Sequence, residues 1–373
     1  MKILITGAKG FVAKNLIQEL RFRGYEDLML YDTDSTKEEL KEYTKECEYV
    51  FHLAGVNRPK EEKEFMEGNF GFTDELLSLL EEAGNKAGIL ITSSIQAALD
   101  NPYGISKKAG EDRMREYEKK TGAKVTIYRL PNVFGKWCRP NYNSAVATFC
   151  NNIARGLEIK VNDPEVMMHL VYIDDVVSEL IDACEGKPHI GADGFGYVPC
   201  VYDVKLGEIP KLLYSYKESR SNFKVPKIAT EFENKLYATY LSYLEADDFS
   251  YPLVMHSDDR GSFTEILKSE GCGQVSVNII KPGITKGEHW HNTKNEKFLC
   301  ISGEISVKFR KIGDDKIYEY KADGTNLQVI DIPTGYTHNI SNIGTQDAAV
   351  IMWANEVFNP DKPDTYFEKV NLE

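Results

Sequence analysis

Five short runs of apolar residues, separated by helical patterns, constrain the first half of this chain more than any other feature. Each run is apolar at successive positions, which is typical of a strand covered on both faces. The segments between the runs repeat apolar residues every three to four positions, as in residues 13–23 and 73–83. This alternation predicts an α/β domain with a doubly wound parallel sheet. The predicted strands are residues 2–6, 28–32, 49–55, 88–94 and 125–130.

The second half has a different pattern. Residues 205–244 are rich in Tyr and Lys and mostly helical in pattern, and a polar stretch closed by a proline follows at 246–252. Short alternating runs separated by Gly, Pro, Asn and Asp come next and predict an all-β barrel or sandwich. We therefore expect two domains, residues 1–245 and 246–373. The predicted strands of the second domain are residues 274–280, 297–303, 304–310, 327–333 and 348–354.

The charge balance and the cysteines exclude several classes of function. The chain has 45 Lys and Arg against 58 Asp and Glu, a net charge of -13, which argues against non-specific binding of nucleic acid or of an anionic membrane. No apolar run approaches the roughly 18 residues of a membrane span, and the first residues show no signal-peptide pattern. Seven scattered cysteines without a C-x-x-C pair are typical of free thiols in a reducing compartment. We expect a cytoplasmic protein without disulfides or a thiolate metal site.

A glycine-rich turn follows the first predicted strand. Its pattern is G-x-x-G-x-x-A, from Gly7 through Gly10 to Ala13. Glycines allow the backbone to approach a diphosphate, and the N-terminus of the next helix supplies free N–H groups, so the turn predicts a Rossmann-type cofactor site. Asp32 ends the second strand, where a carboxylate can accept hydrogen bonds from ribose hydroxyls. An isolated turn of this kind also joins strands to helices without a ligand, but its place after an N-terminal apolar strand favours the cofactor. The candidate cofactor-binding residues are Gly7, Lys9, Gly10, Phe11, Val12, Asp32, Leu53, Ala54, Gly55, Tyr103 and Lys107.

Tyr103 and Lys107 form a Y-x-x-x-K pair after the fourth predicted strand. Residues four apart share one face of a helix, so the ammonium can lower the pKa of the phenol and hold a nicotinamide ribose. The hydroxyl of Ser94 would complete a proton relay at a carbonyl group, with Ser93 as the second choice. Such a pair also arises by chance where a tyrosine only packs. Its place after the glycine turn and beside two serines favours catalysis by Ser94, Tyr103 and Lys107.

With these motifs, residues 1–245 resemble the nucleotide-sugar branch of the extended short-chain dehydrogenases/reductases. Two later segments, RLPNVFG at 129–135 and LVYIDDV at 170–176, look like further landmarks of that branch. The resemblance implies that Tyr103 is the general acid/base and that the serine orients the carbonyl. The loop after Gly135 offers cations and amides for a sugar diphosphate, although cations in a loop are also often only solvated. The candidate substrate-binding residues here are Asn132, Lys136 and Arg139.

Four residues of the second domain have the spacing of metal ligands. His289 and His291 lie two apart, so on a strand they face the same side, and Glu296 and His338 can close the site from neighbouring strands. Three imidazoles and one carboxylate suit zinc, iron, manganese or nickel, and we expect Zn²⁺. The spacing looks like that of a cupin β-barrel over about residues 253–373. One departure is that Leu327 stands where the second cupin motif begins with a glycine, and Gly324 is the nearest glycine.

The segment D-x-R-G-x-F-x-E at 258–265 is similar to the opening segment of cupin-type deoxysugar epimerases, in which the arginine meets the substrate. Here that arginine is Arg260, which is otherwise a surface residue in a turn. A reductase joined to such a cupin resembles the bifunctional capsular-polysaccharide enzymes of the CapF/WbjC type. That resemblance implies C3 epimerisation of a UDP-2-acetamido-2,6-dideoxy-4-hexulose, followed by NADPH-dependent C4 reduction to UDP-2-acetamido-2,6-dideoxy-L-talose, on the route to UDP-N-acetyl-L-fucosamine.

The sequence allows alternatives for the cofactor, for the catalytic base and for the overall function. Asp32 would repel the 2'-phosphate of NADPH and Lys9 would offset that repulsion, so we expect NADPH, with NADH as the alternative. The base that removes the C3 proton is Lys297, Tyr336 or His289. Two other functions are a simple UDP-4-ketosugar reductase with a non-catalytic, dimerising cupin, and a nucleotide-binding redox regulator. We also expect a homodimer formed through the cupin domain.

Overall fold

The protein is described by a computed structural model that covers residues 1–372, and its chain divides into two compact units. Unit 1 comprises Met1–Tyr214 and Thr230–Glu245, and unit 2 comprises Ser215–Ala229 and Ala246–Glu373. One division therefore falls at residue 246, where the sequence pattern changes, but residues 215–229 group with the second unit. The physical reason is backbone pairing, because the N–H of Val225 donates to the carbonyl of Lys268 at 2.6 Å and the N–H of Lys268 donates to that of Phe223 at 2.6 Å.

Unit 1 is built on a parallel sheet of five strands in the order β2-β1-β3-β4-β5. All five predicted strands are present, but β2 and β3 end earlier than predicted because Asp32 and residues 53–55 belong to the loops that follow them. Strand β1 lies between β2 and β3, so the strand order reverses there. In open α/β sheets, ligands bind in the crevice at the carboxyl ends of strands beside such a switch point. The strands are β1 (Ile3–Thr6), β2 (Leu28–Tyr31), β3 (Tyr49–His52), β4 (Gly88–Ser94) and β5 (Val125–Leu130).

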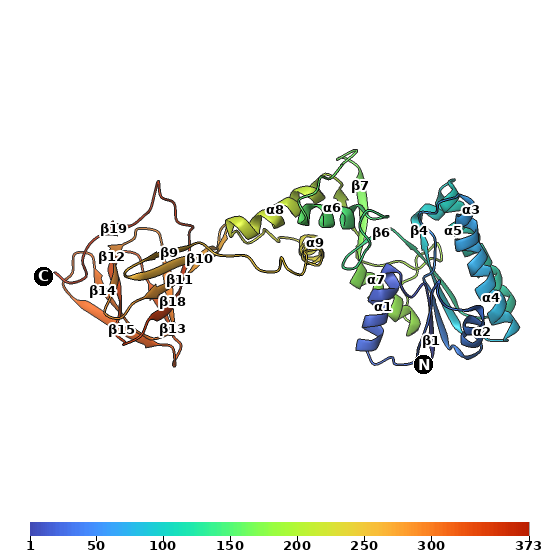
Figure 1. The fold of residues 1–373 in the computed structure, drawn as a ribbon, viewed down its shortest axis with the longest axis horizontal. Helices are drawn as coiled ribbons and strands as arrows, with labels where there is room; N and C mark the ends of the chain where they lie inside the picture. The colour runs from blue at the N-terminus through green and yellow to red at the C-terminus, as the bar shows by residue number, and fades with distance from the viewer. Residues whose placement is uncertain (373) are drawn as a thin grey trace. The chain divides into compact units, whose positions relative to one another are not determined.

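Helices cover both faces of this sheet, as Figure 1 shows for unit 1. On one face, α1 (Phe11–Phe22) and α7 (Ile173–Cys184) bury side chains such as Leu16 and Leu180. On the other face, α2 (Lys37–Glu46), α4 (Phe72–Glu82) and α5 (Pro102–Thr121) bury a second set that includes Leu76 and Met114. The doubly wound arrangement predicted from the sequence is confirmed.

The remaining elements of unit 1 include a π-helix and a second, small sheet. Strands β6 and β7 of this sheet are parallel and β8 is antiparallel to β7. Helix α8 begins in unit 1 and its last residues group with unit 2. The elements are α3 (Lys63–Phe65), the π-helix η1 (Met66–Gly71), the 3-10 helix η2 (Ile95–Ala98), β6 (Asn132–Phe134), α6 (Ala145–Ala154), β7 (Met167–Tyr172), β8 (Tyr202–Lys205), α8 (Glu208–Asn222) and α9 (Glu231–Leu241).

Unit 2 consists of two antiparallel sheets around an apolar core. Their orders are β16-β13-β18-β11-β10-β9 and β15-β14-β17-β12-β19. Residues such as Phe298, Ile305 and Val350 form the core between them. The predicted antiparallel β-barrel after a Rossmann-type sheet is confirmed. The strands are β9 (Met255–Asp258), β10 (Gly261–Ser269), β11 (Gly273–Ile280), β12 (Thr285–Trp290), β13 (Glu296–Ser302), β14 (Glu304–Lys311), β15 (Ile317–Asp323), β16 (Val329–Ile332), β17 (Tyr336–Asn342), β18 (Ala348–Ala354) and β19 (Tyr366–Phe367).

Two details of unit 2 differ from the sequence interpretation. Strand β15 is one of several strands that are absent from the predicted set, and its first five side chains are exposed, so it has no buried face to mark it. The turn after β15 explains the displaced glycine of the second cupin motif. A Cβ atom at Gly324 would lie 2.7 Å from the carbonyl oxygen of Ile301, so the close backbone approach occurs at 324 and not at Leu327.

Two expectations about the whole chain concern membranes and cysteines. Within residues 1–372, no helix is both long enough and apolar enough to cross a membrane. The longest helix, α5, has 20 residues and is rich in charge. All seven cysteines are free thiols.

Candidate functional site

The glycine turn lies against the loop after β3, at the switch point of the unit 1 sheet. Gly7 has φ +70°, and a Cβ atom there would lie 2.7 Å from Cα of Ala54. A Cβ atom at Gly10 would lie 2.9 Å from the carbonyl oxygen of Gly7. Phe11 and Val12 then begin α1 and pack against the core. The edge is thus lined by backbone, which suits a diphosphate group at a helix N-terminus.

Asp32 and Lys9 meet at the same edge, through the backbone. The N–H of Lys9 donates to the Asp32 carboxylate at 2.7 Å, and the N–H of Thr33 donates to its other oxygen at 2.8 Å. The ammonium of Lys9 pairs instead with Asp34, at 2.5 Å, and hydrogen bonding to that carboxylate raises the pKa of Lys9. Asp32 therefore closes the glycine turn, and Lys9 carries an exposed cation beside two carboxylates.

Tyr103 and Lys107 lie in the first turns of α5, next to the carboxyl end of β4. The helix starts here because Asn101 caps it, accepting the N–H of Gly104 at 2.8 Å, and Pro102 occupies its first position. Burial raises the pKa of the Tyr103 phenol, and a hydrogen bond with Ser94 opposes that rise. Tyr103 and Ser94 therefore lie close to each other.

Lys107 connects this helix to the loop after β3. Its buried ammonium donates to the carbonyl of Thr92 at 3.2 Å, and a Cβ atom at Gly55 would lie 3.1 Å from it. Burial lowers the pKa of Lys107 to about 8. The pKa of the Tyr103 phenol is raised mainly by burial.

Ser93, the second choice for the catalytic serine, faces another partner. Its hydroxyl donates to Glu111 at 2.6 Å, and Glu111 also pairs with Arg129 at 2.6 Å. Side chains alternate across a strand, so Ser93 and Ser94 point to opposite faces. The structure therefore brings Ser94, and not Ser93, to Tyr103.

Asn69 is a site residue that the sequence interpretation missed. It lies buried in η1, where its side chain accepts the N–H of Val56 at 2.9 Å and donates to the carbonyl of Val56 at 3.0 Å and to the hydroxyl of Ser106 at 2.9 Å. It thereby ties the loop after β3 to α5. π-Helices are rare and often occur at functional sites. The available signal was a pair of glycines, Gly68 and Gly71, inside an otherwise helical pattern.

The three predicted substrate residues of unit 1 differ in their surroundings. Asn132 is exposed at the start of β6. Lys136 forms an ion pair with Asp174, and both side chains are partly exposed. Arg139 lies 5.1 Å from the ring of Tyr142, and within residues 1–372 no carboxylate is at ion-pair distance from it. Of the two cations, Arg139 is thus the one without a carboxylate partner within the described residues.

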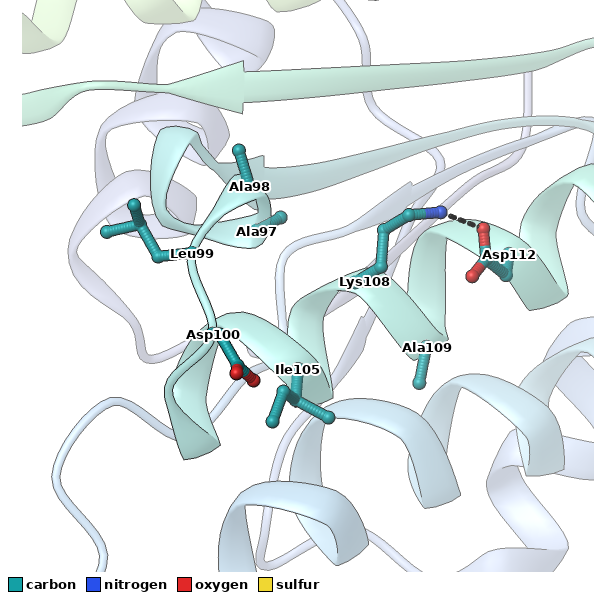
Figure 2. Close-up of a pocket in the computed structure, with 8 residues that line it drawn as sticks. All are labelled: Ala97, Ala98, Leu99, Asp100, Ile105, Lys108, Ala109 and Asp112. Atoms are coloured by element: carbon teal, nitrogen blue, oxygen red, sulfur yellow. Dashed lines mark hydrogen bonds and ion pairs between the residues drawn. The ribbon is translucent and has the colours of Figure 1, made fainter.

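A hollow of about 420 Å³ on α5 is distinct from this site. Figure 2 shows its lining, in which Lys108 and Asp112 form an ion pair. The helical residues that line it recur at three-to-four spacing and do not include Tyr103 or Lys107. It therefore belongs to another face of the helix. The lining residues are Ala97, Ala98, Leu99, Asp100, Ile105, Lys108, Ala109 and Asp112.

In unit 2, the structure brings His289, His291, Glu296 and His338 together. One ligand atom from each lies within 4.8 Å of the others. His289 and His338 are paired across β12 and β17, after a bulge between Gly287 and His289 that turns the histidine inward. The strand β12 ends at Trp290, so His291 begins the loop that leads to Glu296 at the start of β13.

The polar atoms of this cluster suit a divalent cation. The Glu296 carboxylate lies 3.4 Å from Nε2 of both His291 and His338. Nε2 of His291 is buried without a hydrogen-bond partner, which is costly unless a cation takes its lone pair. Although burial opposes the charge of Glu296, the two imidazoles hold its pKa well below the usual range. Burial lowers the pKa of His289 to about 4, so its imidazole is neutral and able to bind metal at pH 7.

The other candidates of unit 2 are placed less centrally. Arg260 is exposed and pairs with Asp258 at 2.6 Å. Lys297, one of three candidate bases, is exposed and pairs with Asp331 at 2.5 Å, so it is not directed into the barrel. Tyr336 is partly buried against the core. His289 belongs to the cluster itself.

Comparison with known proteins agrees with this division of the chain. The family described as "NAD dependent epimerase/dehydratase family" matches residues 3–187. The family described as "Polysaccharide biosynthesis C-terminal domain" matches residues 256–366. The fold and the comparisons thus define a short-chain dehydrogenase/reductase-type unit followed by a polysaccharide-biosynthesis domain.

Relatives that span the whole chain identify the family more closely. A UDP-2-acetamido-2,6-beta-L-arabino-hexul-4-ose reductase from Pseudomonas aeruginosa is 43% identical over 366 residues, which are 98% of each chain. The crystal structure of the capsular polysaccharide assembling protein CapF from Staphylococcus aureus has 54% identity and a TM-score of 0.94, and covers 99% of this chain and 100% of that one. A structure of CapF with the inhibitor 3-isopropenyl-tropolone has 49% identity, a TM-score of 0.89 and the same coverage. The chain belongs to the family of these proteins.

We predict that Gly7→Ala weakens binding of the nicotinamide cofactor by about tenfold or more, roughly 1.4 kcal/mol. The added Cβ would clash with the backbone of Ala54 at 2.7 Å and push the two loops apart. Gly24→Ala is the matched control, because Gly24 has φ +86° but open space around it, so it reports the cost of positive φ alone. Fluorescence titration with NADPH and NADH measures both variants, and equal affinities would remove Gly7 from the cofactor site.

Proposed function

We propose that this protein is a bifunctional nucleotide-sugar enzyme. Unit 2 epimerises C3 of a UDP-2-acetamido-2,6-dideoxy-4-hexulose, and unit 1 then reduces the C4 ketone to UDP-2-acetamido-2,6-dideoxy-L-talose, on the route to UDP-N-acetyl-L-fucosamine. The observation that carries the proposal is the meeting of Tyr103 and Ser94, with Lys107 buried beside the cofactor loop, at the sheet edge that holds the glycine turn. The P. aeruginosa relative bears the name of a reductase that acts on a UDP-hexul-4-ose, and this name supports a UDP-4-ketosugar as the substrate.

In the reduction, the residues of unit 1 hold the ketone and supply a proton. The bound nicotinamide cofactor supplies hydride to C4. Tyr103 donates its proton to the C4 oxygen, and Ser94 orients that oxygen by a hydrogen bond. A phenol whose pKa is raised by burial stays protonated at neutral pH, which suits a proton donor. Lys107, held by Thr92 and next to Gly55, binds the nicotinamide ribose and compensates charge at the phenolate.

We further propose that the cofactor is NADPH. The 2'-phosphate would meet the ammonium of Lys9, which lies exposed next to Asp34 and shields that phosphate from Asp32. NADH is the alternative because the carboxylate of Asp32 also suits a free ribose hydroxyl. The ratio of kcat/KM for the two cofactors with one ketosugar decides between them.

Arginines take the diphosphate of the substrate in this proposal. Arg139 is an exposed guanidinium without a carboxylate partner in the described chain, and Asn132 is exposed at the start of β6. Lys136 contributes less because Asp174 neutralises it. In unit 2, Arg260 would exchange its bond with Asp258 for the substrate.

The epimerisation uses the acidity of the C3 proton, which lies next to the C4 ketone. A divalent ion, which we expect to be Zn²⁺, would polarise the ketone oxygen when bound. The buried, unpartnered Nε2 of His291 supports this assignment, since it needs an acceptor of its lone pair. His289, Glu296 and His338 would complete the ligand set. Of the three candidate bases, Tyr336 fits the placement of the side chains better than Lys297, which is on the outer surface.

One experiment tests both halves. The ketosugar is incubated with the protein in D₂O with and without NADPH, and the product is analysed by NMR. Without NADPH, we expect deuterium to enter the ketosugar at C3. With NADPH, we expect a product that is epimerised at C3 and reduced at C4. Reduction without deuterium at C3 would favour a simple reductase with a non-catalytic second unit. If neither reaction occurs, the result would indicate a nucleotide-binding regulator.

We predict that the protein is a homodimer formed through unit 2, because one edge strand of each of its two sheets exposes apolar side chains. Tyr320 on β15 is 54% exposed and Val329 on β16 is 58% exposed. Covering such edges stabilises a β protein against other pairings. Tyr320→Glu should therefore halve the mass measured by light scattering, whereas Tyr197→Glu, an exposed tyrosine of unit 1, should not. A dimer that survives Tyr320→Glu and Val329→Glu would place the interface elsewhere.

We predict that Tyr103→Phe lowers the rate of C4 reduction by about 10² to 10⁴ and leaves deuterium exchange at C3 unchanged. The phenolic proton is needed only when hydride reaches C4. Tyr197→Phe serves as the control for loss of a hydroxyl. The reduction rate and the exchange are measured separately, and a variant that reduces at the wild-type rate would make Tyr103 a packing residue.

We predict that His338→Ala removes the metal and the C3 exchange, while reduction of an already epimerised ketosugar continues. Since three of the four ligand residues remain in this variant, its metal content is measured beside its activity. His256→Ala, an exposed histidine of the same unit, is the matched control. Metal loss with exchange intact would make the ion structural, and loss of reduction would show that the two units do not function independently.

A further inference from the structure

The last residues of the described chain run over the predicted metal ligands. We call residues 363–370 the C-terminal strap. Its strand β19 pairs with β12, with Phe367 opposite His289 and Tyr366 opposite Trp290. The hydroxyl of Thr337, the neighbour of His338, donates to the carbonyl of Glu368. The strap therefore contacts the strands that carry two of the four ligands.

The far end of the strap is anchored independently of the ligand cluster. The buried guanidinium of Arg310 donates to the carbonyls of Val370 at 3.0 Å and Lys369 at 2.8 Å, and to the carboxylate of Glu368 at 2.7 Å. The carboxylate of Glu288 accepts the N–H of Val370 at 2.6 Å. Because these groups satisfy each other inside the protein, the strap has a fixed position on the barrel.

At its other end, the strap holds the remaining two ligands through Asp364. The carboxylate of Asp364 accepts backbone N–H groups of Asn292 at 3.1 Å, Thr293 at 2.8 Å and Lys294 at 2.9 Å. These residues form the turn between His291 and Glu296. The three bonds hold the pKa of the Asp364 carboxyl well below its usual range despite a partial burial that opposes its charge.

The backbone carbonyl of Asp364 sets the tautomer of His291. Nδ1 of His291 lies 2.6 Å from that carbonyl oxygen. A carbonyl only accepts hydrogen bonds, so Nδ1 carries the proton in the neutral ring and the lone pair is on Nε2. Nε2 is the atom that is buried without a partner and lies 3.4 Å from the Glu296 carboxylate. Nε2 of His291 and the Glu296 carboxylate both carry lone pairs and lie next to each other. A cation that binds both atoms makes this arrangement favourable.

Asp364 has a backbone conformation that needs support. Its φ is +39°, which is unusual for a residue other than glycine and costs free energy that other contacts must offset. The bonds from residues 292–294 provide that support. The carboxylate thus holds its own carbonyl in place against His291 while it holds the turn that leads to Glu296.

We propose that Asp364 is a positioning residue of the metal centre, which fixes the tautomer of His291 and the turn between His291 and Glu296. This inference rests on the metal site of the proposed function. Partners in the outer shell of a metal site commonly change affinity by about 10- to 100-fold when they are replaced. Asp364 does not bind the metal itself. Replacing it therefore leaves all four ligands present but holds them in position less firmly.

The test compares full-length variants that are stripped with a chelator and titrated with Co²⁺ or Zn²⁺ against a chromophoric competitor. Asp364→Ala should weaken affinity by about 10- to 100-fold and alter the visible absorption bands of bound Co²⁺. Asp361→Ala is the matched control, because it removes the same charge from a neighbouring exposed position. Asp364→Asn, which tolerates positive φ and keeps one acceptor oxygen, should recover part of the affinity.

Each outcome bears on a different claim. Equal affinities and equal Co²⁺ spectra for Asp364→Ala and Asp361→Ala would overturn the positioning role. Wild-type protein that binds no metal would overturn the metal centre on which the inference rests. The circular dichroism spectrum reports whether each variant is folded. If Asp364→Ala is not folded, Asp364→Asn is compared with the wild type instead. A metal affinity and a Co²⁺ spectrum equal to those of the wild type would then overturn the positioning role.

Discussion

The contact between the backbone at Gly7 and the backbone at Ala54 is the constraint on which unit 1 depends. Two loops from opposite sides of the switch point meet there with no room for a side chain. The helix α1 starts from one loop, and Lys107 reaches the other next to Gly55. The proposed cofactor site and the proposed proton donor therefore share one edge because the sheet reverses its strand order at β1. A bulkier residue at position 7 would push the two loops apart.

The second site has a different physical basis. In unit 1 the polar groups are brought together by the ends of parallel strands, whereas in unit 2 they come from strands and a loop of an antiparallel barrel. Burial without hydrogen-bond partners, as at Nε2 of His291, makes that cluster unfavourable unless a cation is present. The proposed metal binding would thereby be linked to the order of the loop after β12, and the strap holds the same loop through Asp364.

Much of the fold could be predicted because its signals are local. The five parallel strands follow from their apolar runs, and the spacing of His289, His291 and Glu296 indicates that these residues lie together. Contacts between distant segments could not be predicted. Nothing in the sequence indicates that Asp34 takes the ammonium of Lys9, that Asp174 takes Lys136, or that residues 215–229 pair with β10. The contact of Asp364 with His291 spans 73 residues and depends on where the chain end folds, which no local pattern encodes.

The allocation of residues 215–229 has a consequence for how the chain can be divided. On the ribosome, this piece of the second unit emerges before residues 230–245, which complete the first. The two units are therefore interleaved in sequence although each is compact. A gene cut at one point, even at the change of pattern near 246, separates one half from a segment that belongs to it. A transplant of the second unit into another protein must therefore carry two pieces of chain, residues 215–229 and the segment that begins at 246.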